Sequence, residues 1–177
     1  MELYEYTPDA ICRAMSIAEF ADRDVLSADP AALRLLLKPS FSPELCITVV
    51  DSALVVTTLR EMLWHRPHPC VLPSVAQRVA VDEEFLSRLG SLFAAARHEI
   101  EHGSGPVLLL DGMHMDAVWP DGAELRELSV GVADEAVEVF LAFILQRAFH
   151  ELTHPLVLRN LQECALHANL ELPTNSS

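Results

Sequence analysis

Two histidine pairs in this sequence have the spacing of a zinc-binding helix. The segment His150–His154 reads His-Glu-Leu-Thr-His, and the segment His98–His102 reads His-Glu-Ile-Glu-His. In the H-E-x-x-H pattern, two histidines one helical turn apart bind Zn²⁺, and the glutamate serves as the general base of a metallopeptidase. Because only one helix can carry such an active site, the presence of two copies weakens each match.

The helical phase of both pairs favours surface histidines over metal ligands. At about 100° per residue, each pair falls on the face opposite the apolar stripe of its predicted helix. Pro155 directly follows His154 and disfavours helical geometry there. Spacing singles out no third ligand among the candidates Glu163, His167 and Glu171. A zinc-dependent hydrolase using His150, Glu151 and His154 is therefore kept only as the alternative reading.

Three other groups of reactive side chains are weaker candidates for a functional site than the two histidine pairs. The segment His65–Cys70 holds metal-ligand residue types in a proline-rich loop, without a matching second ligand pair nearby in sequence. Gly103–Gly105 contains a serine, but it follows a helix and does not match G-x-S-x-G. Asp111 and Asp116 flank His114, and a turn acid and an exposed strand acid explain them more simply than acid–base catalysis. The sequence predicts no active site and no cofactor.

The charge of the chain is strongly acidic and unevenly placed. It has 26 acidic and 12 basic residues, for a net charge of −14. This balance argues against nucleic-acid binding, which depends mainly on Lys and Arg. Ten of the carboxylates lie between Glu99 and Glu138, where Arg126 is the only Lys or Arg before Arg147. Such a stretch is either a solvated face or a docking surface for a basic protein. The predicted partner-binding residues are Asp111, Asp116, Asp121, Glu124 and Glu127.

Length and composition indicate one globular domain. The 177 residues are 51% hydrophobic, which suffices for one sizeable core, and we expect a single domain over residues 1–172 with a disordered tail over 173–177. The N-terminus has neither the basic nor the apolar region of a signal peptide, and no apolar run approaches the roughly 20 residues of a membrane span. The four cysteines are widely spaced and are predicted to be reduced and mostly buried. We expect a cytoplasmic protein.

The second half of the chain predicts a hairpin between two long helices. Asp82–His102 is a helix with an N-cap aspartate and two acids in its first turn. Pro106–Val130 is an antiparallel hairpin near the sheet centre, with Val107–Leu110 as a buried run and the reversal at Pro120–Gly122. Asp134–Thr153 is a second amphipathic helix packed on the same face. The residues expected to be buried in these helices are Phe85, Leu89, Leu92, Phe140, Ile144 and Leu152.

The first half of the chain predicts a helix followed by strands. A helix should run from about Pro8 to Asp22, and a strand from Leu35 to Phe41. Leu45–Val50 and Leu54–Leu63 are rich in Val, Ile and Thr, and form a predicted hairpin around an Asp-Ser turn. Val75–Val81 is a further short strand. The expected fold is α+β, with a mainly antiparallel sheet of about five or six strands and helices packed on one face.

Three short motifs resemble a group of bacterial proteins. They are Pro39-Ser40-Phe41 before a strand pair, Leu59–Trp64 closing that pair, and Leu110-Asp111-Gly112 opening the next hairpin. Over residues 39–150 this layout resembles small divergent bacterial α+β proteins, some of which act as immunity partners of secreted toxins. The resemblance implies a non-enzymatic cytoplasmic protein that neutralises a toxin by binding it, with no catalytic residues to carry over. An acidic contact surface would suit a basic toxin or effector, with no role for nucleic acid or a membrane.

Overall fold

The computed structural model describes residues 6–63, 70–102 and 112–172. Within these ranges the strands are β1 (Leu33–Pro39), β2 (Leu45–Val50), β3 (Ala53–Leu59), β4 (Ser74–Ala80), β5 (Met113–Asp121) and β6 (Glu124–Gly131). The helices in the same ranges are α1 (Pro8–Ala14), α2 (Arg23–Leu26), α3 (Glu83–His102), α4 (Glu135–Glu151) and α5 (Pro155–His167). The strand predicted at Val107–Leu110, most of the loop at His65–Pro73 and the tail at 173–177 lie outside the described residues.

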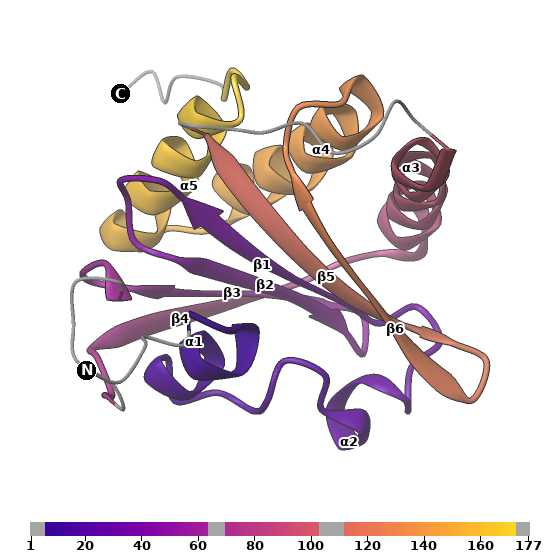
Figure 1. Ribbon diagram of the computed structural model, residues 1–177, viewed down its shortest axis with the longest axis horizontal. Helices are drawn as coiled ribbons and strands as arrows, with labels where there is room; N and C mark the ends of the chain where they lie inside the picture. Colours follow the sequence, from indigo (N-terminus) through magenta and orange to yellow (C-terminus); the bar gives the residue numbers. More distant parts are fainter. Residues whose placement is uncertain (1–5, 64–69, 103–111, 173–177) are drawn as a thin grey trace.

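All six described strands form one antiparallel sheet, in the order β4-β3-β2-β1-β5-β6 (Figure 1). The predicted α+β class and strand number are confirmed. The predicted hairpin of β5 and β6 is present. Its predicted place near the sheet centre is wrong, because β1 and β2 are the central strands and β6 lies at an edge of the described sheet. β2 and β3 also form the predicted hairpin, with Asp51 and Ser52 at φ values of 50° and 54° in its turn.

The sheet separates two layers of helices. The three longer helices, α3, α4 and α5, cover one face, and the short helices α1 and α2 lie against the other (Figure 1). Side chains of β1 alternate between the layers, as the pleat requires: Leu35 and Leu37 join the core under the longer helices, and Leu36 joins the core under α1 and α2. The prediction that the helices pack on one face therefore holds for the longer helices only. The short helices α1 and α2 cover the other face and form a second, smaller core that was not predicted.

Helices α3 and α4 follow the predicted pattern closely. Asp82 caps α3, because its Oδ1 accepts a hydrogen bond from the Phe85 backbone N–H at 2.7 Å. Of the six predicted core side chains on these helices and just after them, five are buried, and Leu92 is half-buried. Phe93, which the prediction omitted, is also buried and contacts Phe140, with ring centroids 5.2 Å apart.

The predicted helix from Pro8 to Asp22 is wrong beyond Ala14. The helix ends there, and Ser16 takes a left-handed φ of 60°. The physical reason is local: the backbone N–H of Ile17 donates to the carbonyl of Cys12 at 3.0 Å, and that of Ser16 to the carbonyl of Arg13 at 3.0 Å, which closes the helix in a Schellman motif. The Arg34 guanidinium donates to the backbone carbonyl of Glu19 at 2.6 Å and to that of Phe20 at 3.3 Å. These contacts hold the segment that follows the helix against β1.

The predicted reversal at Pro120–Gly122 is displaced by two residues. Pro120 and Asp121 belong to β5, and the chain turns at Gly122 and Ala123, with Gly122 at a φ of 66°. Pro120 is tolerated in the strand because the pairing of β5 with β1 stops at Val118. On that side, therefore, no ladder bond needs the N–H that proline lacks.

The cysteines agree with the prediction of reduced and mostly buried thiols. All four cysteines are free thiols, of which three are buried and Cys70 is half-buried. Among the described residues, no helix combines the length and the apolar character needed to cross a bilayer.

Candidate functional site

The tip of the β5–β6 hairpin brings two of the predicted partner-binding acids together. Asp121 and Glu124 are directly opposite each other in the strand register, and both are exposed. Arg126 lies on the same strand face and forms an ion pair with Asp121, with Nε and Oδ2 3.3 Å apart. More than half of each of these two side chains is exposed, so the pair contributes little stability, and Arg126 offsets one of the two negative charges at the tip.

The remaining predicted acids are not part of this tip cluster. Glu127 is exposed but lies on the opposite face of the hairpin, because it alternates with Arg126 along β6. Asp111 lies outside the described residues. Glu99, from the wider acidic stretch, accepts a hydrogen bond from the Ala136 backbone N–H at 3.0 Å and so serves the start of α4. The acids of this stretch therefore have several different roles.

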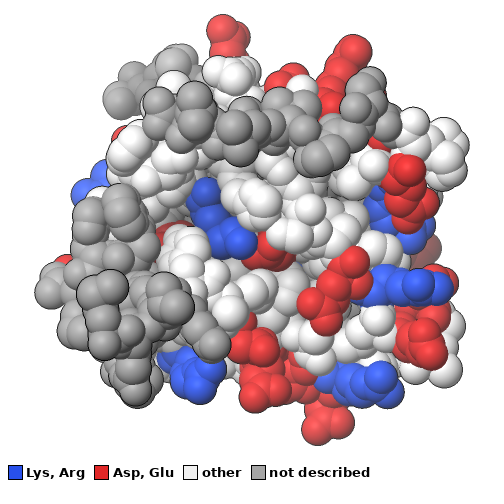
Figure 2. All heavy atoms as spheres, in the orientation of Figure 1, with Lys and Arg blue, Asp and Glu red and all other residues white. Residues whose placement is uncertain are grey.

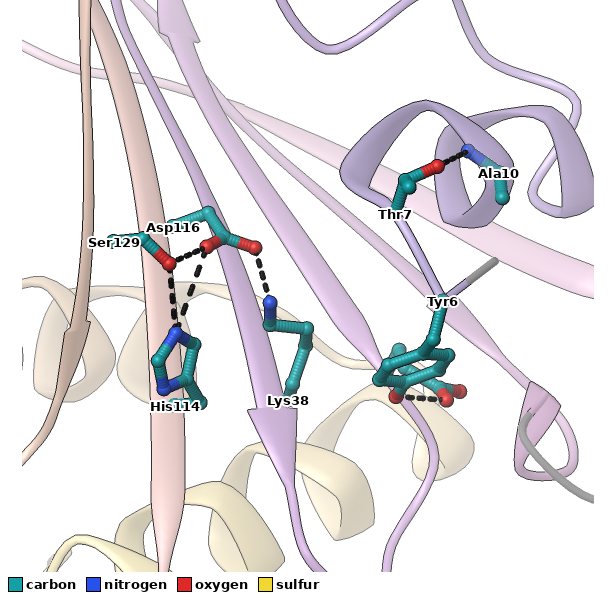
Figure 3. A network of polar contacts seen from close by, with 8 residues as sticks. Tyr6, Thr7, Ala10, Lys38, His114, Asp116 and Ser129 are labelled. Atoms are coloured by element: carbon teal, nitrogen blue, oxygen red, sulfur yellow. Dashed lines mark hydrogen bonds and ion pairs between the residues drawn. The ribbon is translucent and has the colours of Figure 1, made fainter. Parts of the chain in front are cut away.

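The prediction that Asp116 is an exposed strand acid is wrong. Only 4% of the residue is exposed, and it lies on β5 between β1 and β6. Its Oδ2 forms an ion pair with Lys38 Nζ at 2.5 Å, and its Oδ1 accepts a hydrogen bond from Ser129 Oγ at 2.5 Å (Figure 3). A carboxylate enclosed in this way is not available to a docking partner, so Asp116 leaves the set of contact residues.

Asp116, Ser129 and His114 have the residue types of a catalytic triad but not its arrangement. Ser129 Oγ lies 2.7 Å from His114 Nε2, so the serine sits between the other two residues (Figure 3). The serine has one proton, which it donates to Asp116, and it must therefore accept from the imidazole. In a triad the imidazole accepts from the serine and the carboxylate orients the imidazole. This network does not activate Ser129 as a nucleophile.

The environment of His114 also disfavours its charged form. Burial lowers its pKa below the ordinary value of 6.5, the nearby Lys38 ammonium lowers it further, and Asp116 opposes both effects. A neutral imidazole that donates to Ser129 fits this environment. The network of these side chains, including Lys38, reads as a polar link that holds β1, β5 and β6 in register.

A second buried carboxylate was missed by sequence reasoning. Glu44 is fully buried, accepts a hydrogen bond from Tyr6 Oη at 2.5 Å, and accepts another from the Leu63 backbone N–H at 3.1 Å. Burial, followed by the charge of Glu44, raises the pKa of Tyr6 well above its usual range. A charge beside an apolar strand, as in Glu44 before β2 or Lys38 within β1, was the available signal.

The two H-E-x-x-H segments have different geometries. Helix α4 ends at Glu151, and His154 has extended backbone geometry as the N-cap of α5. The Nδ1 of His154 accepts a hydrogen bond from the Leu156 backbone N–H at 3.2 Å, so His150 and His154 are not on successive turns of one helix.

The other pair, His98 and His102, does lie on successive turns of α3. Both residues are exposed, with stacked rings whose centroids are 4.5 Å apart. The Nδ1 of His102 lies 3.0 Å from the carbonyl oxygen of its own helical neighbour His98. Within the described ranges, no group of three or more His, Cys, Asp or Glu side chains is placed to hold a metal ion.

Comparison with known proteins gives no family for this chain. No family model matches it, and no curated protein is detectably similar to it. The assignment of a function therefore depends on the surface and on the site geometry.

Proposed function

We propose that this protein is a non-enzymatic binding protein that contacts a basic protein partner through the tip of the β5–β6 hairpin. The observation that carries the proposal is the pair Asp121 and Glu124, two exposed carboxylates that face each other across the strand ends. Acidic side chains gather along the lower and right-hand parts of the molecular face that includes the hairpin, with basic ones among them (Figure 2).

Electrostatics explains how such a surface would select its partner. The net charge of −14 creates a long-range attraction for cationic proteins, and exposed acids at a protruding tip meet the partner first. Complementary charges mainly raise the association rate and exclude acidic competitors. The partner should therefore carry a basic patch, and its binding should weaken as salt is added.

The finer part of the proposal is that the partner is a bacterial toxin or effector and that this protein is its immunity protein. The support is the layout of residues 39–150, which resembles small α+β proteins of that type. An immunity protein needs no reaction chemistry of its own, because it acts by covering its partner. The arrangement of Ser129, His114 and Asp116, which does not activate a nucleophile, fits such a role.

A capture experiment with charge-reversed variants tests this function. The wild-type protein, Asp121→Lys/Glu124→Lys and the control Glu101→Lys/Glu171→Lys are immobilised and exposed to a lysate of the source cells. The control reverses two exposed acids outside the hairpin and has the same net charge as the test variant. We expect the wild type and the control to retain one basic protein that the hairpin variant loses. Retention of the same protein by all three, unaffected by salt, would show that the hairpin tip is not the contact.

A further inference from the structure

The two edges of the sheet formed by the described residues are protected to different degrees. β4 pairs with β3 along its whole length and β6 pairs with β5, and in the described part of the chain no strand pairs with the outer side of either. An unpaired strand edge is a template for another strand, and proteins commonly block it with charges, proline or a bulge. β6 carries three charged side chains, Glu124, Arg126 and Glu127.

β4 has almost none of this protection. Its sequence, Ser-Val-Ala-Gln-Arg-Val-Ala, contains a single charge, Arg78, and neither proline nor glycine. Val75 and Val79 pack toward the core under the longer helices, while Ala76, Arg78 and Ala80 are exposed on the other face. The exposed side of the strand is therefore small and nearly uncharged, which allows close approach of a second backbone.

The β4 edge is also held in place before any partner arrives. At its start, Ser74 Oγ donates to the Met15 carbonyl at 3.0 Å, and just after its end the Val81 N–H donates to the Ser52 carbonyl at 2.9 Å. In the middle, Gln77 Oε1 accepts from the backbone N–H groups of Thr153 at 3.1 Å and His154 at 2.8 Å. A strand fixed at three points loses little entropy on pairing.

We propose that two copies of this protein associate by antiparallel pairing of β4 with β4, which joins their sheets across a twofold axis. This inference does not depend on the proposed function. A second copy fits because the edge complements itself, and twofold symmetry brings the same patch of both copies together. Arg78 is the only charged residue of β4 and would repel a basic protein, so the partner proposed for the acidic hairpin does not fit this edge.

The charge of Arg78 also selects the register of the pairing. All seven residues of β4 pair only when the twofold axis passes at Gln77, which places Val75 opposite Val79 and Ala76 opposite Arg78. Moving the axis to Arg78 would place two arginines directly opposite each other, which is destabilising. In the favoured register, each Arg78 faces the small Ala76 of the other copy, twice per dimer.

The salt dependence of this association differs in sign from that of the proposed partner binding. Each copy carries a net charge of −14, so two copies repel each other over the Debye length, which is about 10 Å at 0.1 M salt. Backbone pairing and valine contacts do not depend on salt in the same way. Added salt should therefore strengthen self-association, whereas it should weaken the binding of a basic protein.

Sedimentation velocity on a concentration series tests the proposal with two opposite substitutions at one position. Ala76→Glu places a carboxylate opposite Arg78 of the other copy, and Ala76→Arg places a like charge there. We expect the first to tighten the dimer and the second to weaken it, each by several-fold to about tenfold, because every dimer contains the contact twice. Ala76 is exposed, and circular dichroism verifies that both variants fold.

The matched controls are Ala94→Glu and Ala94→Arg, which make the same changes at an exposed position of α3. They change the net charge by the same amounts as the Ala76 variants. Their dimerisation constants should change less, and only through net charge, so that Ala94→Arg dimerises slightly more tightly than Ala94→Glu. A protein that stays monomeric up to about 1 mM, where even weak pairs are measurable, overturns the proposal. So does a dimer whose constant changes equally for substitutions at Ala76 and at Ala94.

Discussion

Removal of the Lys38 ammonium should destabilise this protein much more than removal of a surface cation. Lys38 and Asp116 form an ion pair in which 12% and 5% of the side chains are exposed. Loss of one member leaves the other charge buried without compensation, which costs about 3–5 kcal/mol. We expect Lys38→Met to cost about 3 kcal/mol, because Ser129 still donates to Asp116 and the Lys38 side chain is partly exposed.

Urea unfolding, followed by circular dichroism, measures this loss as a change in the free energy of unfolding. Arg126→Met is the matched control, since it removes a cation from the exposed ion pair on the same hairpin and should cost less than about 1 kcal/mol. The double variant Lys38→Met/Asp116→Leu removes both charges and should recover most of the loss. If Lys38→Met costs no more than Arg126→Met, the reasoning about the buried pair is refuted.

Three further predictions concern the titratable side chains. The folded-state pKa of His114 lies below 6.5, so its contribution to stability is present above pH 6.5 and is lost as the pH falls through the folded-state pKa. His114→Gln should therefore reduce the loss of unfolding free energy on acidification, measured by urea unfolding at a series of pH values. His154→Ala should cost about 1 kcal/mol in urea unfolding because it removes the cap of α5, whereas the exposed His150→Ala should stay within about 0.5 kcal/mol; equal effects would contradict the capping role. Burial raises the pKa of Cys164 to about 12, so a thiol reagent at pH 8 should label it only after unfolding.

The elements that were predicted well depend on local sequence signals. The cap at Asp82, the apolar stripe of α3 and the hairpin of β2 and β3 each depend on signals that lie close together in the sequence, and each was confirmed. The early end of α1 was not predictable in this way. The helix ends where Ser16 takes a left-handed φ of 60°, with no glycine or asparagine to indicate it, and the segment that follows is held by Arg34, a residue of another element.

The candidate site was predicted only in part for the same reason. The exposure of Asp121 and Glu124 follows from their place at a hairpin tip, which the turn residues indicate. The burial of Asp116 follows from the pairing of β1 with β5, which brings Lys38 beside it from a distant part of the chain. The number of acidic residues in a stretch of sequence therefore does not distinguish exposed carboxylates from those that link strands.

The affinity of the captured basic partner, measured as a function of salt, tests the central claim most directly. Isothermal titration calorimetry would compare the wild-type protein with Asp121→Lys/Glu124→Lys, using Glu101→Lys/Glu171→Lys as the control. We predict that at low salt the hairpin variant binds at least about tenfold more weakly than the control, and that the difference disappears near 1 M salt, where the Debye length is about 3 Å. Equal affinities of the two variants at low salt would contradict the assignment of the hairpin tip as the binding surface.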